Sequence, residues 1–121
     1  MSRVQIHDLC KTFGAITAVD KLNLDVQSGE LVALLGPSGC GKTTTMRMIA
    51  GLLTPTAGDI RFDGQSVLRV PAERRGAVMV FQKHLLFPHM NVADNVGFGL
   101  KMRGVAPREI AQRVSAMLAL V

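Results

Sequence analysis

The residues L-V-A-L-L at positions 31–35, followed directly by G-P-S-G-C-G-K-T at 36–43, set the fold of this chain. The first five residues are apolar on both faces, which predicts a central strand of a parallel sheet. The next eight match G-x-x-x-x-G-K-[ST], where glycines let the backbone approach phosphate oxygens closely. A helical pattern follows, which completes the order strand, loop, helix. The sequence therefore predicts an α/β fold that binds a nucleoside triphosphate with Mg²⁺.

The residues of this loop have distinct expected roles. Successive backbone N–H groups should form an anion-binding nest at the positive end of the helix that begins near Lys42. The Lys42 ammonium group should reach the β- and γ-phosphates, and the Thr43 hydroxyl group should ligate Mg²⁺. Cys40 lies where any small residue fits, so we expect no catalysis from it, although its alkylation would block the nucleotide. The expected binding residues are Gly36, Pro37, Ser38, Gly39, Cys40, Gly41, Lys42, Thr43 and Thr44.

Composition and charge narrow the class of protein. The chain has 121 residues, 48% of them hydrophobic, with neither Trp nor Tyr, which fits one globular domain. The net charge is +5, but no basic cluster exceeds Arg74-Arg75, which favours a solvated surface over nucleic-acid binding. Cys10 and Cys40 are interpreted as reduced cytosolic thiols. No apolar stretch reaches the roughly 18–20 residues of a membrane span, and no signal peptide is seen, so a cytoplasmic protein is expected.

Alternating and apolar runs predict further strands. Residues 4–9 alternate apolar and polar side chains, and residues 16–26 form a second β-like stretch. Residues 59–64 predict a short strand that ends in a D-G turn. Residues 77–81 form a second apolar strand, closed by Gln82. The chain therefore combines an antiparallel part with the apolar strands of a parallel sheet.

Helical periodicity follows the loop and returns near the end of the sequence. A first helix of about three turns should carry an apolar face of Met46, Ile49, Ala50 and Leu53. A second should begin after an N-cap at Asn91, with an apolar stripe of Val92, Val96 and Leu100. Pro107 should open a third, with apolar residues Ile110, Val114, Leu118 and Val121. Because this last pattern is still periodic at Val121, we expect the sequence to stop inside an element.

In the order of these motifs, the chain resembles the N-terminal half of an ATP-binding cassette (ABC) ATPase, the engine of ABC transporters. The resemblance runs from about Val4 to the last residue, through K-T-F-G at 11–14, the glycine loop with its following threonines, A-G-L at 50–52, G-D-I at 58–60 and M-V-F-Q at 79–82. The segments 87–92 and 95–100 resemble the importer branch, whose members serve polyamine, iron(III) and sugar uptake. The resemblance implies one partial domain over residues 1–121: an antiparallel β part, the P-loop and Q-loop regions of a P-loop NTPase core, and the start of a helical subdomain.

The resemblance also assigns residues and partners. It implies that Phe13 stacks on adenine, and that Gln82 contacts Mg²⁺ or the attacking water and acts in catalysis with Lys42. The region Gln82–Asn91 would meet transmembrane permease subunits, and a second ABC subunit would complete a dimer. The protein would lie at the cytoplasmic face of the bacterial inner membrane. His84 and His89 have no metal-site spacing and are interpreted as contact or surface residues.

The residues with which this family hydrolyses ATP are not found between positions 1 and 121. They are a Walker B aspartate with its adjacent glutamate, an L-S-G-G-Q signature and a late histidine. We therefore expect a cassette truncated before that half, which binds ATP without hydrolysing it alone and which aggregates or is molten in isolation. Three alternatives remain: a non-catalytic cassette that binds ATP or a partner, a soluble cassette protein of translation or DNA repair, and a P-loop nucleotide kinase.

Overall fold

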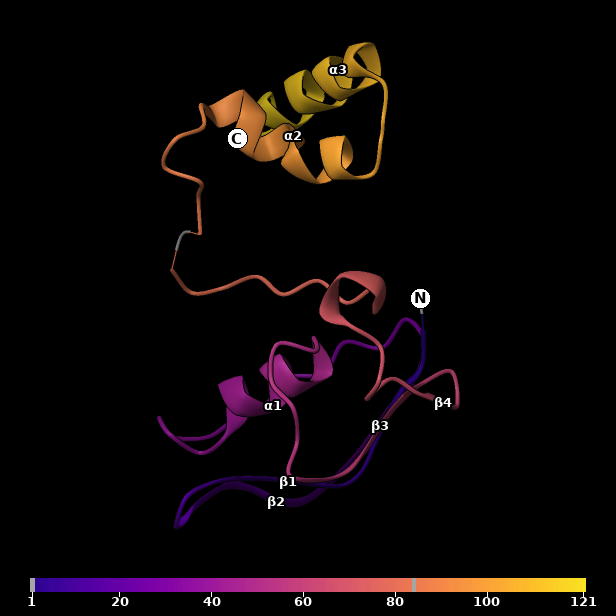
Figure 1. Cartoon of the computed structure of the whole chain (residues 1–121), viewed down its shortest axis with the longest axis vertical. Helices are drawn as coiled ribbons and strands as arrows, with labels where there is room; N and C mark the ends of the chain where they lie inside the picture. The colour runs from indigo at the N-terminus through magenta and orange to yellow at the C-terminus, as the bar shows by residue number, and fades with distance from the viewer. Residues whose placement is uncertain (1, 84) are drawn as a thin grey trace. The chain divides into compact units, whose positions relative to one another are not determined.

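The computed structural model describes residues 2–83 and 85–121, and the contacts between residues divide the chain into two units. The first unit is Met1–Val80 and the second is Phe81–Val121. Each has its own secondary structure, and each is described by itself below (Figure 1).

The first unit is built on an antiparallel sheet with the strand order β2-β1-β3-β4. Its strands are β1 (Val4–Phe13), β2 (Ile16–Val26), β3 (Ala57–Phe62) and β4 (Gln65–Ser66). The turn between β3 and β4 is the predicted D-G pair, where Asp63 has φ 50° and Gly64 has φ 81°. Two positive φ angles are what a type I′ hairpin turn requires. The antiparallel part of the prediction is therefore confirmed, with β1 longer than expected.

Helix α1 (Lys42–Ile49) contributes to the core that covers this sheet (Figure 1). Ile6 of β1 lies opposite Ile60 of β3, and both side chains are buried. Met48 of α1 is buried in the same cluster. Burial of side chains of this size stabilises a fold by about 1.5–3 kcal/mol each. The core thus fixes α1, and with it the loop that precedes the helix, against the sheet.

The predicted helix after the glycine loop is shorter than expected, and its predicted apolar face is confirmed except at Met46. Gly51 has φ 81°, its N–H donates to the Met48 carbonyl (3.2 Å), and the Leu52 N–H donates to the Arg47 carbonyl (2.9 Å). This is the Schellman pattern that ends a helix. Ala50 is buried, and Ile49 and Leu53 pack against the core as expected. Met46 was expected on the same face but is 51% exposed, whereas Met48 is fully buried.

The two apolar segments that the sequence predicts as parallel strands are not strands in this structure. Residues 31–35 and 77–81 carry no strand assignment, and Leu31 is 98% and Val80 92% exposed. A strand exists only through hydrogen bonds to a neighbouring strand. Within residues 2–83 and 85–121, the sheet consists of the four strands β1, β2, β3 and β4, and both segments lie outside it. The strand prediction for these segments is therefore wrong for this chain.

The second unit is a pair of packed helices, α2 (Val92–Met102) and α3 (Pro107–Leu118). The predicted N-cap is confirmed, since the Asn91 side chain accepts a hydrogen bond from the Asp94 N–H at 2.8 Å. Pro107 is the first residue of α3, as expected. Helix α3 ends at Leu118, so the prediction that it is still helical at Val121 is wrong.

The face of α2 that packs on α3 includes Gly97, and of the predicted apolar stripe only Leu100 is half-buried. Val92 is 66% and Val96 is 42% exposed, while Gly97 is buried. A Cβ atom at Gly97 would lie 3.0 Å from Ile110 Cγ2 and 3.3 Å from Val114 Cγ2. The absence of a side chain at this position is what lets the two helices approach closely.

Candidate nucleotide site

The glycine loop reaches α1 through a backbone conformation that needs glycine. Gly41, the residue before the helix, has φ 89°. A Cβ atom there would collide with the Ala18 carbonyl oxygen and lie 3.1 Å from Val19 Cγ2. Gly39 has a similar φ of 82°, but nothing lies within 4 Å of the place its Cβ would take. Gly41 therefore seats the loop against β2, and Gly39 leaves the loop backbone open to a ligand.

The N-terminus of α1 suits an anion. It has no acidic residue in its first turn and no side-chain cap among the described residues. The first N–H groups of a helix lack partners inside the helix and carry its positive partial charge. The Thr45 hydroxyl group is buried and donates to the Gly41 carbonyl at 2.9 Å, which secures the turn into the helix. These features fit the phosphate cradle that the motif predicts.

Lys42 lies across the loop. Its ammonium group donates to the carbonyl oxygens of Gly36 at 2.5 Å and Pro37 at 2.7 Å, and it lies 3.2 Å from Cys40 Sγ. The sulfur atom is also where a Cβ on Gly36 would collide, at 2.5 Å. The loop thus folds tightly around a single positive charge.

The charge of Lys42 changes the chemistry of its neighbour. Its hydrogen bond to Sγ lowers the pKa of the Cys40 thiol below the ordinary value. Cys40 is exposed, whereas Cys10 is half-buried in β1. The more reactive of the two thiols therefore lies in the phosphate loop.

The predicted magnesium ligand Thr43 is exposed at the start of α1, and Thr44 is half-buried. Within the described residues, no group of three or more His, Cys, Asp or Glu side chains could hold a metal ion by itself. A hydroxyl group that shares Mg²⁺ with phosphate oxygens and water is the arrangement such an ion accepts. The residues present therefore fit a metal that arrives with the nucleotide.

A cavity of about 360 Å³ adjoins the loop within the first unit. Residues of β2 and of the 33–35 segment supply its apolar wall, and its two charged lining residues are Asp20 and Lys42. The cavity places Lys42 at a boundary between apolar and polar surface.

The predicted adenine-stacking residue Phe13 is the last residue of β1 and is 49% exposed. The Lys11 ammonium group lies 5.1 Å from the centre of its ring. The same ammonium group donates to the Thr54 carbonyl at 2.7 Å. Lys11 thus engages the ring through a cation–π contact, and the half-exposed ring keeps surface on which a base can stack.

The predicted residue Gln82 is exposed and belongs to the second unit. Its role at the nucleotide therefore stays a prediction. His84 lies outside the described residues. His89 is exposed and meets the Phe87 ring edge-on, with centroids 6.0 Å apart, which is consistent with a contact residue.

Sequence reasoning missed Asn95, which holds the segment after Gln82. Its side chain accepts from the Phe87 N–H at 2.8 Å and donates to the carbonyls of Phe87 (3.2 Å) and Met90 (3.1 Å). The Phe87 ring also packs on Phe98 of α2, with centroids 4.5 Å apart. One amide side chain thus anchors the backbone that the resemblance assigns to the permease contact. Its sequence signal is weak, since a polar residue inside a helix is ordinarily solvated.

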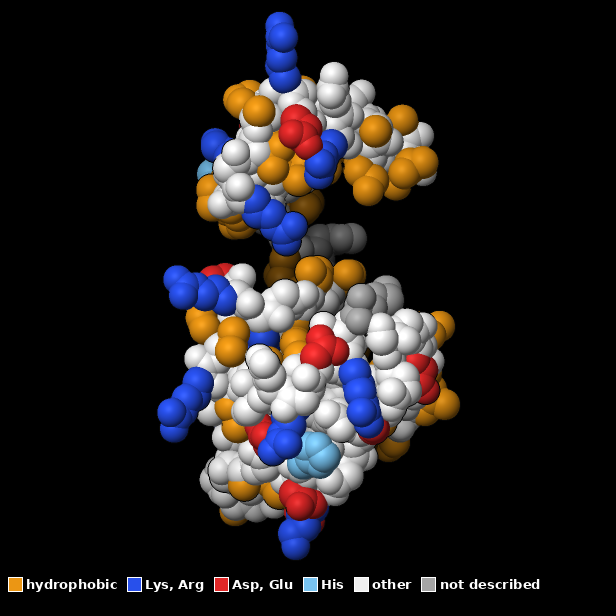
Figure 2. Space-filling model, turned by 90° about the vertical axis from the view of Figure 1, so that its right-hand side faces the viewer, with side chains coloured by type: hydrophobic (Ala, Val, Ile, Leu, Met, Phe, Trp, Pro, Cys, Tyr) orange, Lys and Arg blue, Asp and Glu red, His pale blue; other side chains and the backbone are white. Residues whose placement is uncertain are grey.

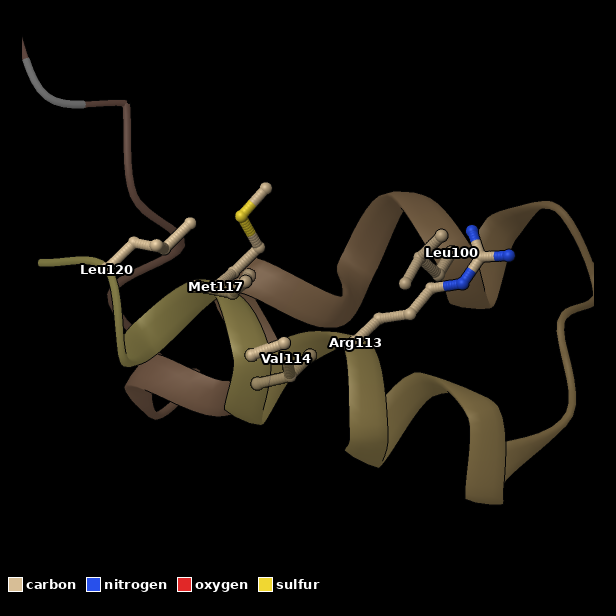
Figure 3. A pocket seen from close by; sticks show the side chains of 7 residues that line it. Leu100, Arg113, Val114, Met117 and Leu120 are labelled. Carbon is tan, nitrogen blue, oxygen red and sulfur yellow. The ribbon is translucent and has the colours of Figure 1, made fainter.

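An apolar pocket of about 630 Å³ lies on the α2–α3 pair (Figure 3). Leu100 of α2 and Val114 and Met117 of α3 line it, and Arg113 is its one charged lining residue. Arg113 pairs with Glu109 one turn earlier on α3. On the face drawn in Figure 2, Lys and Arg side chains stand in separate groups, as the scattered basic residues predict.

Comparison with known proteins identifies relatives that match nearly the whole chain. A model of the ABC transporter family matches residues 19–121. The chain is 51% identical over 118 residues to the spermidine/putrescine import ATP-binding protein PotA of Nitrosospira multiformis, with 98% of this chain and 32% of that protein covered. It is 52% identical over 118 residues to the Fe(3+) ions import ATP-binding protein FbpC 1 of Rhizobium meliloti, again over 98% of this chain and 33% of that protein. The chain thus spans about a third of the length of these curated relatives.

A solved structure shares the fold. It is the dimeric structure of a post-hydrolysis state of the ATP-binding cassette MJ0796 bound to ADP and Pi. The two proteins are 27% identical, with a TM-score of 0.82 over 96% of this chain and 56% of that one. The predicted fold class, an α/β cassette with an antiparallel N-terminal sheet, is therefore confirmed.

Proposed function

This chain belongs to the ABC transporter family, and we propose that it is the ATP-binding part of an importer subunit that couples ATP to solute uptake. The observation that carries the proposal is the loop at 36–43, seated by Gly41 on β2 and opening onto the uncapped N-terminus of α1. The two relatives, which are import ATP-binding proteins for spermidine/putrescine and for Fe(3+), support an importer over a translation or DNA-repair protein. The nucleotide-kinase alternative has no support from them.

In the proposed site, the residues of this chain bind and orient Mg-ATP. Backbone N–H groups of the loop and of α1 would donate hydrogen bonds to the phosphate oxygens, with Lys42 offsetting their negative charge. Thr43, with Gln82, would hold Mg²⁺, which when bound neutralises charge that develops on the phosphate oxygens. Phe13 would stack on the adenine ring, a contact worth about 1–3 kcal/mol by analogy with base–aromatic stacking.

We assign transport partners to the second unit. The segment Gln82–Asn91 would contact a transmembrane permease subunit, because Asn95 anchors its backbone while Leu85 and Leu86 are 66% and 69% exposed. A second cassette would form the dimer, as in the solved relative. The protein would then work at the cytoplasmic face of the membrane. No helix in the described part of the chain has the length and apolarity to cross a bilayer.

We further propose that these 121 residues bind ATP without hydrolysing it alone. No acidic residue occurs in the loop or along α1. Lys42 and Gln82, the proposed catalytic residues, carry no carboxylate that could polarise an attacking water. Lys42 would therefore contribute phosphate binding here, and the whole cassette would supply turnover.

The test measures the affinity of the chain for Mg-ATP and for Mg-tripolyphosphate by calorimetry, with phosphate release followed in parallel. Wild type should bind both ligands, and Lys42→Ala should bind neither. Phe13→Ala should bind ATP more weakly and tripolyphosphate as tightly as wild type. Phe13→Tyr, which keeps a ring, is the matched control. Wild-type binding that Lys42→Ala leaves unchanged refutes the proposed site. Turnover that disappears in Lys42→Ala refutes the proposed inactivity.

A further inference from the structure

Arg75 is a half-buried cation that the predicted nucleotide site does not use. It directly follows the short 3₁₀ helix η1 (Ala72–Arg74) in the first unit. Its Nη1 atom donates to the carbonyls of Met48 at 2.7 Å and Ile49 at 3.1 Å, and its Nε atom donates to the Val70 carbonyl at 3.2 Å. Burial lowers the pKa of this guanidinium group, but arginine remains charged at neutral pH.

Two of the three carbonyls that Arg75 binds, those of Met48 and Ile49, belong to the last turn of α1. The Schellman bonds at Gly51 and Leu52 engage the carbonyls of Met48 and Arg47 and leave that of Ile49 to another donor. Arg75 supplies it and gives Met48 a second donor. A positive charge at this place also complements the negative end of the helix.

Gly51 makes room for this contact. A Cβ atom at Gly51 would lie 2.9 Å from both Cζ and Nε of Arg75 and 3.1 Å from Ala72 Cα. The glycine that ends α1 therefore also lets the guanidinium group and η1 approach the end of the helix. Gly51 and Arg75 are far apart in the sequence but are in close contact here.

Helix α1 depends on such support because it is short. It has eight residues, or a length of about 12 Å, and helices below about 12–15 residues are marginal on their own. Its buried anchors are Thr45 and Met48. Without the hydrogen bonds from Arg75, the last turn of α1 would fray. The N–H groups of the first turn would then have to be ordered when a phosphate binds, and this cost weakens the affinity.

We propose that Arg75 is a positioning residue of the nucleotide site: its guanidinium group fixes the C-terminal end of α1 and so holds the phosphate-binding N–H groups at the other end. The inference rests on the proposed function, and it adds to the nucleotide site a residue that would not touch the nucleotide.

The test compares Arg75→Met with Arg74→Met in the full chain. Arg74 is the matched control, since it is the neighbouring arginine, belongs to η1 and is exposed. At a temperature where circular dichroism shows all variants folded, affinities for Mg-ATP and Mg-tripolyphosphate are measured. We expect Arg75→Met to weaken both about three- to tenfold, in line with losing charged hydrogen bonds. Arg74→Met should stay within about twofold of wild type.

The conservative variant Arg75→Lys separates positioning from mere stability. One ammonium group can serve the carbonyls of α1 but not Val70 as well, so it should recover part of the affinity. If Arg75→Met does not fold, Arg75→Gln, which removes the charge, replaces it in the comparison, and an affinity equal to that of Arg74→Met overturns the inference. Equal affinities of Arg75→Met and Arg74→Met, or a loss for ATP without a loss for tripolyphosphate, also overturn it. A wild-type chain that binds neither ligand instead overturns the proposed function.

Discussion

Cys40 is the side chain of the phosphate loop whose chemistry is easiest to follow. Because the hydrogen bond from Lys42 lowers the pKa of its thiol, the thiolate forms at a lower pH than for an ordinary cysteine. We expect a haloacetamide to label Cys40 before the half-buried Cys10, with a rate that rises with pH about a midpoint below the usual thiol range. Mass spectrometry of peptides from timed samples measures both rates.

The control for this prediction is Lys42→Ala. Without the ammonium group the thiol pKa returns toward its ordinary value, so the midpoint of labelling should move to higher pH. Bound Mg-ATP should protect Cys40 in the wild type. Labelling of Cys40 whose pH dependence is the same in both proteins would contradict the pairing of Lys42 and Cys40.

Gly39 and Gly41 share a left-handed backbone but differ in their surroundings. Alanine at either position incurs the strain of a positive φ, of order 1–3 kcal/mol. At Gly41 the added methyl group also collides with the Ala18 carbonyl, whereas at Gly39 it meets open space. We therefore expect Gly41→Ala to lower the unfolding temperature more than Gly39→Ala does. Equal thermal shifts would show that the loop does not rest on β2.

The candidate loop residues could be named from the sequence, whereas Arg75 could not. G-P-S-G-C-G-K-T is a contiguous motif, and the roles proposed for its members follow from local backbone geometry. Arg75 acts on Met48 through 27 positions of sequence separation. Its neighbour Arg74 looks the same in the sequence and is exposed. Which of two adjacent arginines is buried depends on tertiary packing, for which a single sequence carries no local signal.

Among the elements, α2 offers a matched pair of glycines. Gly97 faces Ile110 at a distance where a methyl group would need that side chain to move, while a methyl group at Gly99 meets nothing within 4 Å. Alanine in place of glycine stabilises a helix interior by about 0.5–1 kcal/mol. Gly99→Ala should therefore raise the stability of the second unit by about that amount, as measured by urea unfolding.

Gly97→Ala should raise the stability of the second unit less than Gly99→Ala does, or lower it, because its methyl group would press on Ile110 and Val114 of α3. The difference between the two variants reports the close approach of the helices. A larger gain from Gly97→Ala than from Gly99→Ala would mean that α2 and α3 do not pack at this point.

The elements that could be predicted are those whose hydrogen bonds close locally. The β1–β2 hairpin and the Asp63-Gly64 turn each pair residues near in sequence, so alternation and turn chemistry suffice. Residues 31–35 and 77–81 have an equally clear apolar pattern, but a parallel strand needs a partner from elsewhere in the chain. On the helix after the loop, Ile49, Ala50 and Leu53 were predicted correctly, and only the choice of Met46 over Met48 was wrong.

In the whole molecule, the exposed apolar segments predict self-association. Leu31, Leu35, Val78 and Val80 are each at least 87% exposed. Exposed apolar side chains on a backbone without strand partners favour association with another chain. We expect sedimentation velocity to show larger species as concentration rises, so ligand binding is best measured at the dilute end.

A double threonine variant at Val78 and Val80 should reduce this association, because it keeps the branched shape and adds hydroxyl groups. Ile16→Thr, at an exposed apolar residue outside these segments, is the control. A monomer at every concentration, with a sharp cooperative thermal transition, would contradict the prediction.

If Phe13 stacks on the base as proposed, its ring with Lys11 beside it would also affect which nucleotides bind. A stacking face responds to the area and polarisability of a base, not to the donors and acceptors on its edge. Such a contact would bind any purine of similar size about equally well. The first unit should therefore discriminate little between ATP and GTP. Preference for one energy carrier over another would then be set by their abundance in the cell.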